Sequence, residues 1–117
     1  MQQIPQARIH GVNDLRLDHI PAPVCGPDDV VVRVQQCGIC GSDLGYLGMG
    51  GLTGPDTPMP IGHELWGEIS EAGANVTHVS IGDRVVVQPL DNGDNIGNGG
   101  TEGGFTPLLL VRNAAKR

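Results

Sequence analysis

Residues 37–64 read CGICGSDLGYLGMGGLTGPDTPMPIGHE, and the rest of the chain is organised around this stretch. Its beginning supplies the thiols of Cys37 and Cys40 together with an acidic residue, and its end places His63 directly beside Glu64. Thiolate, imidazole and carboxylate groups are the side chains with which proteins bind zinc. The stretch therefore predicts a metal site whose ligands come from both of its ends.

The segments on both sides of this stretch have the pattern of short β-strands. Residues 6–20 alternate apolar and polar positions around a turn at 11–14, which predicts a hairpin. Residues 30–36 (VVVRVQQ) predict a strand that leads directly to the two thiols. Further strands are expected at residues 64–71, 84–88 and 105–111.

Between these strands we expect one helical turn and two long loops. Ser42 has the side chain of a helix N-cap, so a short turn of helix is predicted over residues 43–47. Residues 48–60 are rich in Gly and Pro and predict a loop of the kind that often serves a function. Residues 91–104 predict a second glycine-rich loop with almost no apolar content.

Composition narrows the class of protein. At 117 residues, with 19 Gly, 9 Pro and 38% apolar positions in short β-branched runs, the chain predicts one loop-rich β domain over residues 1–117. The net charge of −6, with scattered basic residues, argues against nucleic-acid binding. No apolar run is long enough to cross a membrane and no signal peptide is evident, so we expect a cytoplasmic protein. Three cysteines, an odd number, favour metal binding and a free thiol over a disulfide framework.

About seven short strands separated by turns predict a small β-barrel or sandwich. No helix is expected to be long enough for a βαβ unit, and no GxGxxG lies between a strand and a helix. A dinucleotide-binding fold is therefore not expected within these residues.

Three motifs occur in the order CGICGSD, GHELWGEISEAG and GDRVVV. With them the chain resembles the N-terminal GroES-like catalytic domain of the zinc-dependent medium-chain alcohol, polyol and threonine dehydrogenases. The zinc signature of that family is matched by Gly62, His63, Glu64, Gly67 and Gly73. The resemblance runs from about residue 6 to 113 and implies a mainly β fold, a partly open β-barrel with short helical turns. Members of the family are longer and add a Rossmann domain for NAD(P), so we expect this chain to be inactive alone.

The resemblance also implies roles for individual residues. Cys40 and His63 match two ligands of one catalytic zinc, and Glu64 matches a residue that closes the zinc shell in some relatives. The implied reaction oxidises a small-molecule alcohol to a carbonyl through a zinc-bound alkoxide, with hydride passing to NAD(P). Ser42 matches the hydroxyl of the proton relay, and Asp43 matches the carboxylate that orients the zinc histidine.

Each role has a plain structural alternative. The alternative role of Ser42 is to cap a helix, and the alternative role of Asp43 is to interact favourably with the dipole of the first helical turn. Glu64 is as well suited to tuning the site electrostatically as to binding metal. A lone cysteine after a strand is usually a small buried hydrophobe, but with GHE in the same chain we favour the ligand interpretation for Cys40. We interpret Cys37 as scaffold, and the alternative is that the CxxC spacing lets it capture a metal ion.

Two departures from the family pattern are evident. Relatives often carry a histidine that continues the proton relay where this chain has Gly45. No cysteine follows Cys40, so the structural zinc of many relatives is not expected. The remaining alternative function is a free-standing GroES-like binding or assembly module without catalysis. For the chain alone we expect self-association, through strand edges or through the strand at 105–111.

Overall fold

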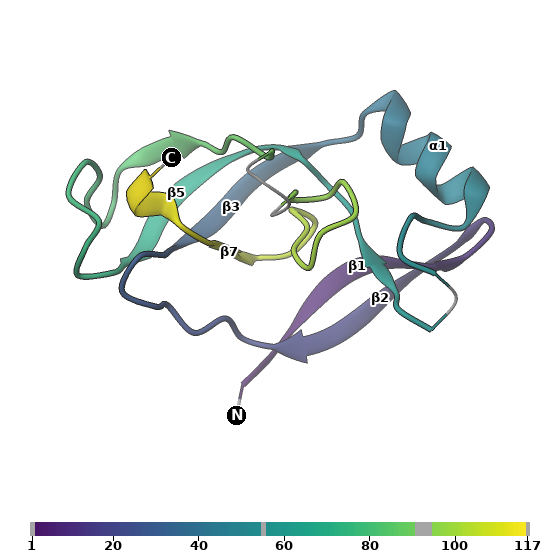
Figure 1. The fold of residues 1–117 in the computed structure, drawn as a ribbon, viewed down its shortest axis with the longest axis horizontal. Coiled ribbons are helices and arrows are strands. Elements are labelled where there is room, and N and C mark those ends of the chain that lie inside the picture. The colour runs from purple at the N-terminus through teal and green to yellow at the C-terminus, as the bar shows by residue number, and fades with distance from the viewer. Residues whose placement is uncertain (1, 55, 91–94, 117) are drawn as a thin grey trace.

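The computed structural model describes residues 2–54, 56–90 and 95–116 (Figure 1). The described elements follow the chain in this order: β1 (Gln3–Gly11), β2 (Asp14–Pro21), β3 (Val30–Gly38), α1 (Gly41–Met49), β4 (Met59–Pro60), β5 (Glu64–Ala72), β6 (Arg84–Val86), β7 (Leu108–Val111) and the 3-10 helix η1 (Ala114–Lys116). Within the part described, no helix is long and apolar enough to span a membrane.

The strands form two antiparallel sheets. One has the order β6-β5-β3-β7 and the other the order β2-β1-β4. β3 and β5 form the most extensive pairing of the larger sheet, with bulges that let the pair curve. The sheets do not close into a single barrel over the described residues, so the predicted mainly β, partly open GroES-like architecture is confirmed.

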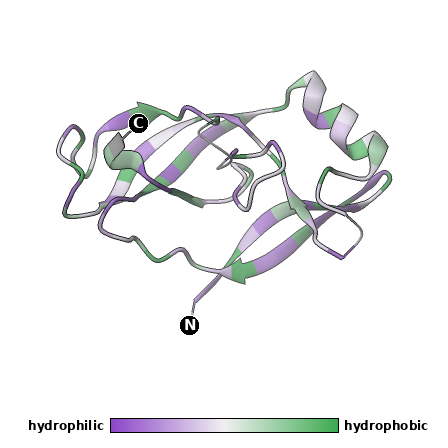
Figure 2. Cartoon of the chain, viewed as in Figure 1, coloured by the Kyte–Doolittle hydropathy of each residue, from purple (hydrophilic) through white to green (hydrophobic). Residues whose placement is uncertain are grey.

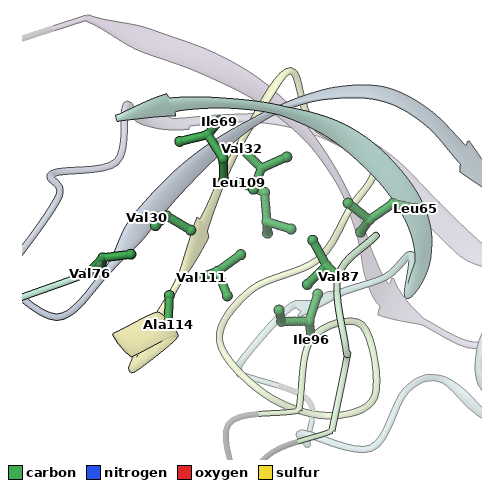
Figure 3. Close-up of a cluster of buried hydrophobic side chains, with 10 residues drawn as sticks. All are labelled: Val30, Val32, Leu65, Ile69, Val76, Val87, Ile96, Leu109, Val111 and Ala114. Atoms are coloured by element: carbon green, nitrogen blue, oxygen red, sulfur yellow. The ribbon is translucent and has the colours of Figure 1, made fainter. Parts of the chain in front are cut away.

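The larger sheet encloses the main hydrophobic cluster, which we call the main core (Figure 3). Its buried members are Val30, Val32, Leu65, Ile69, Val76, Val87, Ile96, Leu109, Val111 and Ala114. Val32 and Leu109 are opposite each other in the β3–β7 register and are 0% and 1% exposed. At about 25 cal/mol per Å² of apolar surface, burial of such β-branched and Leu side chains is the main force that holds this sheet together.

Alternation along β3 and β7 buries side chains on both faces of the sheet. Val31 and Leu110 are register partners that alternate with the residues of the main core and so lie on the opposite face of the sheet. Both are also buried. By contrast, hydrophobic and hydrophilic positions alternate along the β1–β2 hairpin (Figure 2). A second, smaller cluster of Ile9, Met59 and Ile61 lies beside β1 and β4, and Tyr46, Leu47 and Phe105 pack against it.

The predicted hairpin is confirmed, since β1 and β2 pair around a turn in which Asn13 has a φ of 53°. The helix was predicted too short, because α1 extends over nine residues. Part of the predicted loop at 48–60 is instead the short strand β4, which pairs with β1. β7 begins later than predicted, after Pro107, whose missing N–H cannot join a ladder. The predicted loop at 91–104 lies partly outside the described residues.

Candidate metal centre

Three potential metal ligands come together at one end of the β3–β5 pair. Cys40, His63 and Glu64 each offer one ligand atom, and these atoms all lie within 4.8 Å of one another. The register explains the meeting, because Gly38 at the end of β3 is paired with Glu64 at the start of β5. The two ends of the stretch 37–64 are therefore joined by strand pairing.

Cys40 is placed by the start of helix α1. It is the N-cap residue, with extended φ and ψ of −96° and 156°. Its backbone N–H donates to Oδ2 of Asp43 at 2.9 Å, which satisfies a donor that the helix itself leaves free. The prediction that Ser42 is the N-cap is therefore wrong: the cap lies two residues earlier, and Ser42 is an exposed residue of the first turn.

Asp43 also faces the ring of His63. Their Oδ1 and Nδ1 atoms lie 3.3 Å apart, and the two side chains are only 3% and 13% exposed. Both atoms are buried and, within the described residues, neither has a well-aligned hydrogen-bond partner. A buried polar atom without a partner is costly, so the pair is suited to a proton on Nδ1 shared with the carboxylate.

This arrangement fits a metal ion. A histidine that binds metal through one ring nitrogen usually donates its other N–H to a carboxylate, and Asp43 stands in that position beside Nδ1. Nε2 of His63 is then the nitrogen left for the ion, together with the thiol of Cys40 and the carboxylate of Glu64. One sulfur, one nitrogen and one oxygen form a donor set typical of zinc.

Cys37 lies outside this group of three potential ligands and packs against the main core. Burial, reinforced by the negative charge of Asp43, raises the pKa of its thiol to about 11. With such a pKa the thiol stays protonated at neutral pH in the metal-free chain. The interpretation of Cys37 as scaffold agrees with this position.

The glycines of the predicted zinc signature are explained by close backbone approaches. A Cβ on Gly62, whose φ is +103°, would lie 2.9 Å from Sγ of Cys37 and from the backbone N of Phe105. A Cβ on Gly67 would lie 2.3 Å from the carbonyl oxygen of Arg33. A Cβ on Gly73 would meet the carbonyl oxygens of Gly26 and Pro27 at the same distance. These positions hold β5 and the metal-ligand segment tightly against their neighbours.

The structure also brings to the site a residue that sequence analysis did not select. Asn98 accepts a hydrogen bond at 2.8 Å from the hydroxyl of Tyr46 in helix α1. Its backbone forms an isolated β-bridge with Ile61, two residues before His63. No sequence signal marks Asn98, which stands among glycines in a polar loop, because its partner is 52 positions away.

Comparison with known proteins agrees with this geometry. Residues 26–115 match the model of the alcohol dehydrogenase GroES-like domain. The chain is 43% identical over 95 residues to (R,R)-butanediol dehydrogenase of Bacillus subtilis (strain 168), a match covering 72% of this chain and 27% of the relative. It is 41% identical over 83 residues to sorbitol dehydrogenase of Homo sapiens, covering 69% of this chain and 23% of that protein. The chain thus spans about a quarter of the length of these relatives.

Solved structures match over almost the whole chain. The crystal structure of 2R,3R-butanediol dehydrogenase from Bacillus subtilis superimposes with a TM-score of 0.80 at 34% identity, covering 95% of this chain and 39% of that one. A cobalt- and zinc-bound thermostable alcohol dehydrogenase from Pyrobaculum aerophilum gives a TM-score of 0.75 at 26% identity, covering 95% and 40%.

Proposed function

Because the chain belongs to the family of alcohol dehydrogenase GroES-like domains, we propose that it is the zinc-binding part of the catalytic domain of an NAD(P)-dependent alcohol or polyol dehydrogenase. Residues 1–117 form one such domain in this proposal. The observation that carries it is the group of ligand atoms from Cys40, His63 and Glu64, with Asp43 against the far nitrogen of the histidine.

The chain's own residues have distinct tasks in the proposed reaction. Asp43 holds the proton of His63 on Nδ1, so that Nε2 keeps its lone pair for the metal. Cys40 supplies a thiolate, and Glu64 supplies a carboxylate oxygen to the same position. The bound zinc supplies Lewis acidity that lowers the pKa of a substrate hydroxyl.

Proton removal falls to Ser42 in this proposal. Its side chain lies on the exposed first turn of α1, two residues after Cys40. Oγ of Ser42 would accept the hydroxyl proton of the alcohol and pass its own proton to solvent. The cofactor that would accept the hydride is NAD(P)+. Gly45 offers no side chain to continue the relay, so water takes the next step.

The substrate class follows from likeness. The two relatives are a butanediol dehydrogenase and a sorbitol dehydrogenase by name, and both names denote small molecules with several hydroxyl groups. We therefore propose a small diol or polyol as the substrate. No βαβ unit that would hold a dinucleotide occurs among the described elements, so the 117-residue chain on its own is expected to transfer no hydride.

Self-association is a further part of the proposal. β6 and β7 are the edge strands of the larger sheet, and their backbone groups offer a template for pairing. Val86 on β6 is 83% exposed, and Ile81 in the turn before β6 is 71% exposed. Sedimentation velocity across a wide concentration range tests this, and a monomer throughout would contradict it.

Metal uptake tests the proposed function. Co²⁺ added to the metal-free chain is expected to bind one ion and to give the thiolate-to-cobalt absorption and d–d bands of a low-coordinate site. Cys40→Ala and His63→Ala are expected to abolish these bands. Cys25→Ala and His78→Ala remove the same side chains from remote positions and serve as matched controls. Uptake that the Cys40 and His63 variants leave unchanged, or no uptake at all, would favour the alternative of a binding module without catalysis.

A further inference from the structure

Helix α1 carries Cys40 at its cap and Asp43 in its first turn, yet little in its sequence stabilises it. It has nine residues, GSDLGYLGM, of which three are glycine. Helices this short are marginal in isolation, and each interior glycine costs about 1 kcal/mol relative to alanine. Asp43 is its buried residue, while Leu44 and Met49 are 64% and 59% exposed. Tertiary contacts must therefore hold the helix in place.

Polar contacts supply much of that hold. At the first turn, Asp43 accepts the backbone N–H of Cys40 and faces His63. At the last turn, the carbonyl of Leu47 accepts the backbone N–H of Asn13 from the β1–β2 turn at 2.8 Å. Between them lies the hydroxyl of Tyr46, which donates to Oδ1 of Asn98 at 2.8 Å. The bond comes from the only side-chain hydroxyl that α1 has beyond its first turn.

Asn98 is itself firmly held. Its Nδ2 donates to the carbonyl of Ile96, a core residue that is 1% exposed. Its backbone bridges to Ile61, which belongs to the second cluster and leads into Gly62 and His63. The preceding residue, Gly97, lies so close to the same segment that a Cβ on it would be 2.3 Å from the carbonyl oxygen of Gly62. Asn98 is thus fixed to the segment that carries His63.

We infer that the Tyr46–Asn98 hydrogen bond is a positioning contact that sets the separation between the Cys40 side and the His63 side of the metal centre. Tyr46 follows Asp43 by three residues on α1. Asn98 forms a β-bridge with Ile61, which precedes His63 by two residues. This bond therefore adds a link between the two halves of the donor set, on the side of the site away from the β3–β5 pairing of Gly38 with Glu64. This inference rests on the proposed function, and it assigns both residues to positioning rather than to metal binding.

The test compares isosteric variants of the full 117-residue chain by Co²⁺ titration. Tyr46→Phe and Asn98→Leu each remove one partner of the bond and are expected to weaken Co²⁺ binding about tenfold, as loss of supporting contacts does in other metal sites. The d–d bands should also shift, because the donor geometry relaxes. The double variant should be no weaker than Asn98→Leu alone, since both changes break the same bond.

Rescue and control variants separate positioning from general damage. Asn98→Asp keeps an acceptor oxygen for Tyr46 but loses the Nδ2 donor to the carbonyl of Ile96, so its Co²⁺ affinity is expected to lie between those of Asn98→Leu and the original chain. Asn75 also makes a side-chain hydrogen bond of 2.8 Å, to Asp28 in an exposed region remote from the ligands. Asn75→Leu and Asn75→Asp therefore control for the lost amide and the added charge, and neither should change Co²⁺ affinity more than about twofold.

The outcomes are distinguishable. This inference is overturned if the original chain binds Co²⁺ tightly and if Tyr46→Phe and Asn98→Leu change neither the affinity nor the spectrum. The proposed function would still stand in that case. An equal loss in the Asn75 variants overturns it too, because the effect would then be nonspecific. If the original chain takes up no Co²⁺, the proposed function fails and this inference fails with it. Amide exchange of α1 that speeds up in Tyr46→Phe, together with the weaker binding, supports the inference.

Discussion

The main core and helix α1 are stabilised by opposite means. The main core joins ten buried apolar residues from β3, β5, β7 and the segments that follow them. Helix α1 projects at one end of the molecule (Figure 1) and buries a charged residue, Asp43, rather than a leucine or valine. The core is held by many interchangeable apolar contacts, whereas the helix combines the packing of Tyr46 and Leu47 on the smaller cluster with a few hydrogen bonds to fixed partners.

This difference separates stability from site geometry. Apolar burial is nondirectional. Loss of a core side chain should therefore lower the free energy of unfolding without changing the position of one metal ligand relative to another. Hydrogen bonds are directional, so loss of one at α1 moves Cys40 relative to His63 at little cost in stability. Variants in the two regions should therefore have different effects on folding and on metal binding.

Gly67→Ala should have the largest effect on stability. It is expected to disturb the main core and the metal-ligand segment at once, so the two regions would no longer respond separately. A Cβ at Gly67 would lie 2.3 Å from the carbonyl oxygen of Arg33, so β3 and β5 must separate. We expect a loss of about 5 kcal/mol or more, enough to unfold a domain of this size. Urea unfolding followed by the fluorescence of Trp66 measures it.

The matched control for this change is Gly45→Ala in helix α1. A Cβ at Gly45 meets no atom within 4 Å apart from its chain neighbours and the backbone of its own helix, and alanine favours a helix, so this variant should gain up to about 1 kcal/mol. A Gly67→Ala variant that unfolds at the same urea concentration as the original chain would show that the β3–β5 approach is not tight.

Leu109→Ala tests the main core alone. Leu109 is 1% exposed and lies opposite Val32, so its truncation leaves a cavity and should cost about 2–5 kcal/mol. The folded fraction should still bind Co²⁺ with unchanged affinity, because no contact of Cys40, His63 or Asp43 is removed. A large fall in that affinity would mean that the core and the site are coupled more strongly than we infer.

Asp43→Asn tests the helix side. The asparagine keeps an oxygen that can accept the Cys40 N–H, so we expect the stability to fall by no more than about 1 kcal/mol. Its amide, however, favours the His63 tautomer with the proton on the opposite nitrogen, which blocks metal binding there. Co²⁺ affinity should therefore fall about 10- to 100-fold. Asp28→Asn, at a partly exposed turn remote from the ligands, is the control. Equal effects of the two changes would contradict a special role for Asp43.

Sequence patterns predict the core better than they predict the site. Alternation of apolar residues marks β1 and β5, and a run of three valines marks the start of β3, where both faces are buried. Both patterns are local in the sequence. The N-cap was misassigned because Ser42 has the common capping side chain, whereas the cap at Cys40 depends on Asp43 reaching back. Asn98 left no local signal at all, because its role arises only when distant segments meet. The family resemblance identified the ligand candidates, but contacts such as Tyr46–Asn98 emerge only from the fold.

The smallest effect is expected at Asp18 on the β1–β2 hairpin, where a third kind of contact is found. Oδ2 of Asp18 accepts hydrogen bonds from Nε of Arg8 at 2.7 Å and, when His10 carries a proton on Nε2, from that nitrogen at 2.6 Å. Burial raises the pKa of this carboxyl, but the hydrogen bonds from His10 and Arg8 outweigh burial, so the pKa is lowered from its ordinary value of 3.8. The ionised form is thus favoured by folding.

A lowered pKa in the folded state means that Asp18 stabilises the fold above pH 3.8 and loses this contribution as the pH falls through its folded-state pKa. Asp18→Asn should therefore reduce stability at neutral pH by less than about 1 kcal/mol, as expected for a partly exposed ion pair, and should reduce the loss on acidification. Urea midpoints measured from pH 6 down to pH 3 test this. Asp14→Asn, at a more exposed position of the same hairpin, should change the pH dependence less. Equal pH profiles for Asp18→Asn and the original chain would show that the Arg8 and His10 contacts contribute nothing to folding, and the contrast between apolar and polar regions would then rest on helix α1 alone.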